Sequence, residues 1–411
     1  MLRKLSFLLT LVFALATFAP LFAQDAPDAG ARVFLPLVTT GGQSDAQTEV
    51  SAEEDLTDSG VEAASSNGTV FVSTNSTDTV RGNEVVMYRA ASGGGLTLTG
   101  RFPTGGLGLG SGLGSQGALI LSSNGQWLFV VNAGSNEISV FSVKSNGLVF
   151  ADKVASGGVR PISLTVRKNF LYVLNAGDPG NISGFKLNGN GKLTPLANST
   201  RFLSNNGSGA APGPAQVSFT PDGGNLVVTE KGTNLIDTYK VQKNGLTTGP
   251  VTHPSSGLTP FGFAFGKDDA LIVSEAFGGA VNGSAVSSYQ VDGNDFHLVS
   301  GSVGTGQTAA CWIAIANNGK IAYSTNAGSA SVSAYQVGKK GALTLLNGHA
   351  GDTGAGTGPT DPATSHNNRF LYVLSPRSQT VVSFAIQTDG SLNSIGSVGG
   401  LPLGSAGIAA W

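Results

Sequence analysis

A short module of strands and tight turns recurs along this chain, and it limits the possible folds more than any other feature. The clearest copy spans residues 214–241, PAQVSFTPDGGNLVVTEKGTNLIDTYKV. It holds three strand-like runs separated by a Pro-Asp-Gly-Gly turn and a Lys-Gly-Thr-Asn turn. Alternation with a period of two residues, bounded by Gly, Asn and Asp, is typical of antiparallel hairpins. The module therefore predicts a sheet built from consecutive hairpins.

Two columns of residues align the copies of this module. The first column ends the second strand and is polar, comprising Asn75, Asn132, Asn175, Glu230, Glu275, Asn326 and Ser375. The second lies in the third strand and is aromatic, comprising Tyr88, Phe141, Phe185, Tyr239, Tyr289, Tyr335 and Phe384. The first column has a mean spacing of 50 residues. Four strands in a unit of roughly 40–50 residues make a propeller blade, so we predict an all-β, seven-bladed β-propeller of four-stranded antiparallel blades over residues 65–411.

The C-terminus is expected to close the ring. Residues 404–411 match an innermost strand that stops before its turn, and residues 65–68 (Ser-Ser-Asn-Gly) match the missing turn. We therefore predict that 404–411 supplies the inner strand of the blade made by residues 69–100, which removes two open sheet edges. Composition agrees, because 60 glycines supply turns and the single Cys311 excludes an intrachain disulfide framework.

The N-terminal region differs from the repeats in character. Residues 1–23 begin with a basic segment, continue with an apolar run over 5–22 and end on the small Ala23, which predicts a signal peptide and a secreted or cell-surface protein. The alternative is an uncleaved membrane anchor, and this segment is the only predicted contact with a membrane. Residues 24–64 hold nine acidic residues against Arg32 alone, which predicts an acidic disordered linker.

Charge and motif patterns limit the classes of partner and cofactor expected for the predicted propeller. Residues 65–411 carry 20 basic and 16 acidic residues without a basic stripe, so nucleic acid is not an expected partner. Gly112, Gly114 and Gly117 satisfy GxGxxG but lead into an apolar strand, which favours a blade connector over a dinucleotide site. The four histidines lack metal-ligand spacing. We expect a monomer without a cofactor, with a divalent cation such as Ca²⁺ at the channel mouth as an open alternative.

Strand polarity places the functional face. If the inner strand of each blade runs downward, every tight turn lies at the bottom and the long connectors, including 97–115 and 194–213, lie at the top. Binding usually occurs on long loops of a rigid scaffold. We therefore predict a site for a small-molecule or carbohydrate-like ligand at the top mouth of the central channel, lined by the polar column.

The predicted catalytic residues are Glu230, Glu275 and Lys231. The two glutamates occupy the same column in consecutive blades, so mutual repulsion would leave one protonated and one ionised, an acid–base pair able to open a lactone. Lys231 or Arg160 would stabilise the developing oxyanion. The alternatives are that the glutamates cap hairpin turns or chelate a divalent cation. The predicted substrate-binding residues are Asn75, Asn132, Arg160, Asn175, Gln216 and Asn326.

The repeated [F/L]-x-V-x-N turn, the Pro-Asp-Gly turn and the G-x-L end of each unit resemble those of the lactonase-type seven-bladed propellers. That family includes 6-phosphogluconolactonases and carboxy-muconate lactonising enzymes, and the resemblance covers about 65–411. Where many members carry histidines, this chain has Gly213 and Ala215, and Glu230 takes the place of the family's acidic turn residue. The resemblance implies a lactone hydrolase or cycloisomerase, which the signal-peptide pattern of residues 1–23 would make a secreted one. A non-catalytic extracellular binding or surface-interaction propeller is the alternative.

Overall fold

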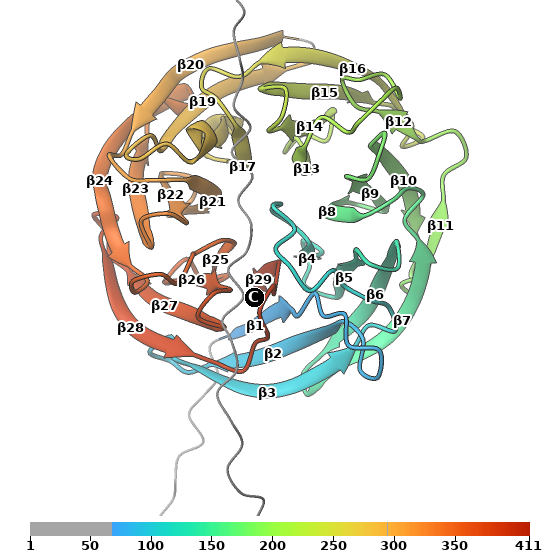
Figure 1. Cartoon of the computed structure of the whole chain (residues 1–411), viewed down its shortest axis with the longest axis horizontal. Helices are drawn as coiled ribbons and strands as arrows, with labels where there is room; N and C mark the ends of the chain where they lie inside the picture. Colours follow the sequence, from blue (N-terminus) through green and yellow to red (C-terminus); the bar gives the residue numbers. More distant parts are fainter. Residues whose placement is uncertain (1–67, 294) are drawn as a thin grey trace, which may run out of the picture. The chain divides into compact units, whose positions relative to one another are not determined.

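The structure, a computed structural model, describes residues 68–293 and 295–411. The predicted signal peptide (1–23) and acidic linker (24–64) lie outside the described residues. The described chain forms seven antiparallel sheets arranged as blades around a central axis (Figure 1). This confirms the predicted seven-bladed β-propeller. We call the face at which the inner strands begin the top.

Each blade has an inner and a second strand close to the axis. The inner strands, from blade 1 to blade 7, are β29 (Ile408–Ala410), β4 (Leu119–Leu121), β8 (Pro161–Arg167), β13 (Pro214–Phe219), β17 (Pro260–Phe265), β21 (Ala310–Ala316) and β25 (Pro362–Thr364). The second strands are β1 (Gly68–Ser73), β5 (Trp127–Asn132), β9 (Phe170–Asn175), β14 (Asn225–Glu230), β18 (Leu271–Glu275), β22 (Ile321–Asn326) and β26 (Phe370–Ser375).

The third and outer strands complete the blades. The third strands are β2 (Glu84–Ala90), β6 (Glu137–Lys144), β10 (Asn181–Leu187), β15 (Leu235–Val241), β19 (Ala285–Asp292), β23 (Ser331–Val337) and β27 (Thr380–Ile386). The outer strands are β3 (Leu96–Pro103), β7 (Gly147–Ala155), β11 (Leu193–Pro195) with β12 (Arg201–Phe202), β16 (Thr247–Pro254), β20 (Asp295–Gly304), β24 (Leu343–Asp352) and β28 (Leu392–Val398). Only blade 3 departs from four strands, because two short strands share its outer position.

Pairing of the last strand with the first closes the ring. β29 is antiparallel to β1, with Ala410 opposite Val70 and Ile408 opposite Val72. The backbones of Thr69 and Trp411 exchange two hydrogen bonds of 2.9 Å. In Figure 1 the red β29 accordingly lies beside the blue β1. The predicted closure by the C-terminal strand is confirmed.

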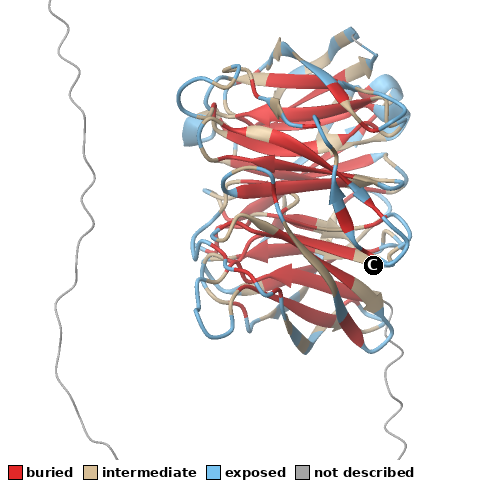
Figure 2. Ribbon diagram, turned by 90° about the vertical axis from the view of Figure 1, so that its right-hand side faces the viewer, coloured by how far each residue is buried: buried red, intermediate tan, exposed pale blue. Residues whose placement is uncertain are grey.

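Apolar side chains fill the space between neighbouring blades. The second strands are almost wholly buried, and exposed residues gather at the turns and outer strands (Figure 2). Every residue of the aromatic column is buried. Three of its tyrosines also donate a hydrogen bond to the preceding blade or its connector: Tyr88 to Gly399, Tyr239 to Phe202 and Tyr335 to Val303, at 2.9–3.1 Å between oxygens. This column therefore supplies both packing and a polar link between blades.

The connectors begin later in the chain than predicted, because outer strands extend further. β3 continues to Pro103, so the connector between blades 1 and 2 comprises residues 104–118. In Figure 1 the teal end of this connector projects into the middle of the ring.

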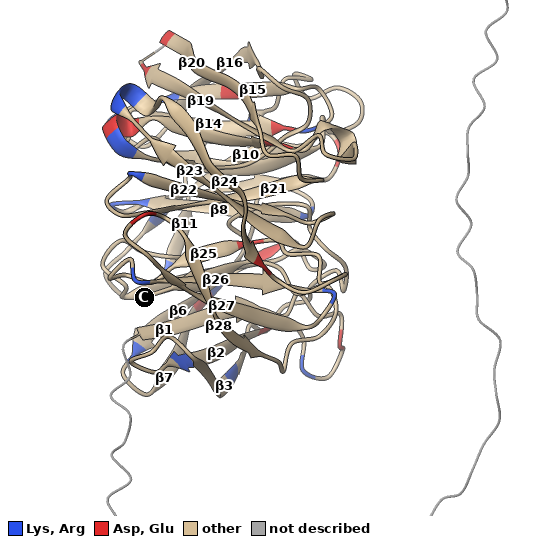
Figure 3. Ribbon diagram, turned by 90° about the vertical axis from the view of Figure 1, so that its left-hand side faces the viewer, with Lys and Arg blue, Asp and Glu red and all other residues tan. Residues whose placement is uncertain are grey.

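Helical structure is limited to the one-turn 3₁₀ segments η1 (Lys267–Asp269), η2 (Phe277–Gly279) and η3 (Lys339–Gly341) among the described residues. None of the described helices has the length and apolarity needed to span a membrane. Charged residues are sparse and lie mainly at the strand ends and in loops (Figure 3).

Removal of residues 404–411 should abolish cooperative unfolding. The deletion takes away the inner strand of blade 1 and exposes the backbone edge of β1, so the ring can no longer close. The measurement is thermal unfolding followed by circular dichroism. Trp411→Ala, which keeps the backbone pairing with Thr69, is the control and should melt at a lower temperature but as sharply as the parent. A truncated chain with an equally sharp transition would contradict this role.

Candidate functional site

A glycine-rich segment projects into the middle of the ring (Figure 1) and contacts several blades there. This plug segment, residues 104–118, is anchored to blade 1 by Asn75. The Asn75 side chain accepts a hydrogen bond from the Leu109 N–H at 2.9 Å and donates to the Ser111 carbonyl at 2.6 Å. Gly108 packs directly on the Asn75 backbone, where any side chain would clash. Asn75 thus holds the plug segment, and its predicted role as a substrate ligand stays a prediction.

Gln116 carries the plug segment across the channel. Its side-chain amide exchanges two hydrogen bonds with the Ile313 backbone on β21, at 2.8 and 3.1 Å. Its own backbone accepts a hydrogen bond from Ser163 on β8 and donates one to Ala215 on β13. One residue therefore joins blades 3, 4 and 6, although they are far apart in sequence.

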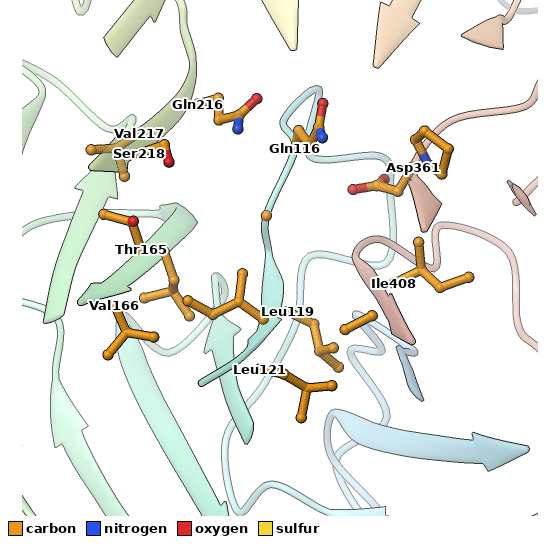
Figure 4. Close-up of a pocket in the computed structure, with 15 residues that line it drawn as sticks. Gln116, Leu119, Leu121, Thr165, Val166, Gln216, Val217, Ser218, Asp361 and Ile408 are labelled. Atoms are coloured by element: carbon orange, nitrogen blue, oxygen red, sulfur yellow. The ribbon is translucent and has the colours of Figure 1, made fainter. Parts of the chain in front are cut away.

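A cavity of about 310 Å³ lies beside Gln116 in the channel. Inner strands of blades 1, 2, 3, 4 and 7 contribute to its wall. Figure 4 shows Gln216, Gln116 and Asp361 along one side, and Leu119, Leu121, Val166 and Ile408 on the other. The Gln216 amide is already paired with the Phe263 backbone, at 2.7 Å to its N–H and 2.9 Å to its carbonyl. Among the residues that line this cavity, Asp361 is the one with an ionisable side chain.

Asp361 is the functional candidate that sequence reasoning missed. Its residue is 3 % exposed, and burial raises the pKa of its carboxyl to about 7, with backbone hydrogen bonds from Gly407 and Gly117 lowering it in part. Figure 4 shows its carboxylate pointing toward the strand that follows Gln116. A signal was available, because Asp361 directly precedes β25 and the inner strands contain no Asp or Glu of their own.

Lys231 lies above the cavity, on the turn that follows β14. Its Nζ donates to the carbonyls of Gly114 and Pro214, at 2.7 and 2.8 Å, and lies 4.8 Å from the centre of the Phe261 ring. An ammonium has three N–H donors, so these two bonds leave one. Burial, together with the positive charge of Arg160, lowers the pKa of Lys231 to about 8.

Cys311 lies at the top of β21 and is buried, and its thiol contacts the Ala309 carbonyl at 3.3 Å. Burial raises the pKa of this thiol to about 12, so it stays neutral near pH 7 and is a poor nucleophile. Asp361 also raises the pKa of this thiol, and the positive charges of Lys231 and Arg377 lower it in part. Arg377 lines a second cavity of about 430 Å³, together with Ser111 of the plug segment and Thr360. Arg160, also predicted for this face, is exposed and donates to the Ala176 carbonyl at 2.7 Å.

The two predicted catalytic glutamates lie in separate hydrogen-bond networks. Glu230 is fully buried and accepts hydrogen bonds from the backbone and hydroxyl of Ser204 and from the Thr233 hydroxyl, at 2.5–2.9 Å. Glu275 is also fully buried. Its carboxylate accepts from Gly257, Ser287 and Ser302 at 2.5–2.8 Å, with Ser255 at 3.5 Å. Each carboxylate thus has its own donors within the protein, and a shared catalytic role stays a prediction.

The remaining asparagines of the polar column point into their own blades. Asn132 donates to Ser139 at 2.8 Å, Asn175 to Asn181 at 2.8 Å and Asn326 to Ser333 at 2.9 Å. All three are fully buried. Their position differs from the expected lining of the mouth because each amide bonds to a polar residue on the adjacent third strand. Their role as substrate ligands also stays a prediction.

No metal cluster is formed by the described part of the chain. Specifically, residues 68–411 without 294 contain no group of three or more His, Cys, Asp and Glu side chains arranged to hold a metal ion.

Comparison with known proteins gives a consistent picture. The family model for the lactonase 7-bladed β-propeller matches residues 82–205, 180–276 and 274–398. A search of curated proteins gave no match. Solved structures share the fold at low identity. One is a protein from Bacteroides fragilis NCTC 9343, provisionally assigned as a 6-phosphogluconolactonase, with 17% identity, 85% of this chain and 99% of that chain covered, and a TM-score of 0.66. Another is the periplasmic gluconolactonase of Pseudomonas aeruginosa, with 17% identity, coverage of 84% and 98%, and a TM-score of 0.62.

Gln116→Glu should destabilise the folded protein by about 1–3 kcal/mol, because the change removes the donor to the Ile313 carbonyl and brings a charge against it. The measurement is the free energy of unfolding in urea. Gln126→Glu is the matched control, since Gln126 is exposed and its side-chain oxygen only accepts a hydrogen bond, from Asn124. Equal stabilities of the two variants would show that the bridge across the channel contributes nothing.

Proposed function

Because the chain belongs to the lactonase family of seven-bladed β-propellers, we propose that it hydrolyses a lactone or a related cyclic ester at the top of the central channel. The observation that carries this proposal is the buried Asp361 carboxyl at the wall of the channel cavity, with the Lys231 ammonium bonded to the plug segment that enters the same cavity. Buried ionisable groups with shifted pKa values beside a cavity, as Asp361 and Lys231 are, are typical of catalytic sites. This proposal gives the acid–base role to Asp361, with Lys231 retained from the sequence prediction.

Asp361 has the properties of a general base. A base acts best when its pKa lies near the working pH, and burial brings the pKa of Asp361 to about 7. Its carboxylate would take a proton from a water molecule as the water oxygen bonds to the lactone carbonyl carbon. The ring C–O bond then breaks, the released oxygen takes up a proton, and the product is an open-chain hydroxy acid.

Lys231 has the properties of an electrostatic stabiliser. Its ammonium is fixed by two carbonyls and by the Phe261 ring, so it needs little reorganisation when negative charge develops on the carbonyl oxygen. A lysine with a pKa of about 8 can also supply the proton that the departing oxygen requires.

The positive charges at the top face favour an anionic or polyhydroxylated substrate. The ion pairs of the described residues are Arg101–Glu84 and Lys153–Glu137, so Arg160, Lys231 and Arg377 are outside them. These groups would attract a carboxylate or phosphate carried by the substrate. The signal-peptide pattern of residues 1–23 supports a secreted or cell-surface location, and a lactone available outside the cytoplasm would be the substrate.

A non-catalytic binding role is the second candidate, and the plug segment favours it. Gln116 and Asn75 hold this segment across the channel with protein–protein hydrogen bonds. A plug segment fixed in this way would leave the second cavity, beside Arg377, as the binding site at the top face. The variants below separate the two functions, because binding alone does not need a general base.

Asp361→Asn should lower kcat/KM toward lactones by about 10²–10⁴-fold, the usual contribution of a general base. The variant should melt at or above the parent's temperature, because it removes a buried ionisable group. The assay is titration of released acid with gluconolactone and a panel of γ- and δ-lactones. Asp352→Asn, at an exposed carboxylate that accepts a hydrogen bond from Gly354, is the control and should keep full activity. Full activity in Asp361→Asn would overturn the proposed role of this residue.

The pH profile of kcat/KM should be bell-shaped with a maximum between about 7 and 8. Activity should rise as pH passes about 7, because Asp361 must lose its proton to act as a base. It should fall as pH passes about 8, because Lys231 must keep its proton to stabilise the oxyanion. Lys231→Met should remove the alkaline limb and lower the maximum. An unchanged alkaline limb in this variant would assign that limb to another group.

A further inference from the structure

A polar pair occupies the same place in several blades, between the end of the second strand and the third strand. Asn132 donates to Ser139 in blade 2, and Asn326 donates to Ser333 in blade 6, at 2.8 and 2.9 Å. In blade 5 the direction is reversed, and Ser287 donates to Glu275 at 2.5 Å. In each of these blades one partner carries an N–H or O–H that completes the pair.

Blade 4 has two carboxyl groups at this place. Glu230 ends β14, and Asp237 lies opposite Val228, the register position that Ser139, Ser287 and Ser333 hold in their blades. Both residues are fully buried. Neither side-chain oxygen of Asp237 has a hydrogen-bond partner as an ionised acceptor. Two ionised carboxylates buried side by side are strongly disfavoured. Neither Glu230 nor Asp237 has an amide or hydroxyl donor, so one of the two carboxyl groups must bind a proton to act as the donor.

The donors around Glu230 show which carboxyl holds the proton. The Ser204 backbone, the Ser204 hydroxyl and the Thr233 hydroxyl all donate to Glu230. Three donors stabilise an ionised carboxylate, which assigns the negative charge to Glu230 and the proton to Asp237. Burial, followed by the charge of Glu230 and the hydrogen bond to it, raises the pKa of Asp237 to about 9.

None of the other titratable groups described near the pair is a cation that forms an ion pair with Glu230 or Asp237. Tyr239 on β15 interacts with both carboxyls, and its pKa is raised well above the usual value by burial and by these acids. Its phenol donates to the Phe202 carbonyl of blade 3. His253 on β16 lies opposite Ile236 and bonds to Thr238. The electrostatic influences on Asp237 itself come from Glu230 and the Ser204 backbone.

We propose that one proton shared by Glu230 and Asp237 fastens the connector 203–213 to blade 4, and that its loss at alkaline pH loosens this connector. Ser204 at the start of the connector is held by Glu230, and loss of the proton from Asp237 would put a second buried negative charge beside that carboxylate and disfavour its position. Gly213 at its end accepts a hydrogen bond from the Lys231 backbone at 2.8 Å. The pair is therefore a pH-sensitive clasp beside Lys231, and it does not depend on the proposed hydrolysis.

The sign of the pH effect follows from proton binding. Asp237 holds its proton in the folded state up to a pH of about 9, whereas in the unfolded chain an aspartate releases it near pH 3.9. The folded state therefore binds more protons between these values. The stability that Asp237 contributes is complete at low pH and falls as pH rises toward 9.

Asp237→Asn tests the clasp, because the asparagine amide has an N–H donor at every pH. In the parent, Asp237 is a donor only while its carboxyl is protonated. We expect full-length parent and variant to have similar melting temperatures at pH 5. Between pH 5 and 9 the parent should lose several degrees relative to the variant. Hydrogen exchange should show residues 203–213 becoming less protected at pH 9 in the parent than in the variant. Parallel pH curves for the two proteins would overturn the proposal.

Glu275→Gln provides the matched control, because Glu275 is equally buried but has serine rather than a second acid as its partner. This variant should change the melting temperature without removing the parent's pH dependence. Calcium and EDTA are added to parent and Asp237→Asn at pH 8. Stabilisation of the parent alone by calcium would show that a cation rather than a proton occupies the pair, and would overturn the proposal.

Discussion

Closure of the ring by β29 is the interaction on which the rest of the molecule depends. An open propeller would leave the edge of β1 unpaired and the last blade without a neighbour. Closure also builds the site, because Ile408 and Ala409 line the channel cavity and the Gly407 backbone contacts the Asp361 carboxyl. Residues 407–409, at and beside the closing strand, therefore complete the wall of the channel cavity around Asp361.

Two glutamine side chains form hydrogen bonds with backbone groups of the inner strands, as a neighbouring strand would. Gln116 and Gln216 each exchange two hydrogen bonds with a backbone N–H and carbonyl of another blade, the pattern by which paired residues of an antiparallel ladder bond. Seven inner strands around an axis cannot pair with one another across it, and these amides supply the missing partners. With the amides occupied, Asp361 is left as the titratable group of the cavity.

Burial acts in opposite directions on the two groups proposed for catalysis. It disfavours the charged form of each, so it raises the pKa of Asp361 and lowers the pKa of Lys231. The two values approach one another near neutral pH, where one group can accept a proton and the other can donate one. The same effect at Cys311 removes a nucleophile, because a thiol with a pKa of about 12 keeps its proton.

The sequence by itself determined the fold, from the blade count to the C-terminal strand that closes the ring. Its period-2 runs and aromatic column repeat the same local interactions in every blade, so one well-read copy predicts the others. It also predicted that Lys231 lies at the top of the channel, since that residue follows a strand end. Only the tertiary structure decided which groups surround the buried acids. Glu230 meets Asp237 instead of Glu275, and Asp361 meets Gly117 and Gly407, because packing of blades and connectors sets these contacts. Some of these contacts join residues far apart in the chain, and others depend on which neighbour in one sheet a side chain meets. Neither kind of contact produces a periodic pattern in the sequence.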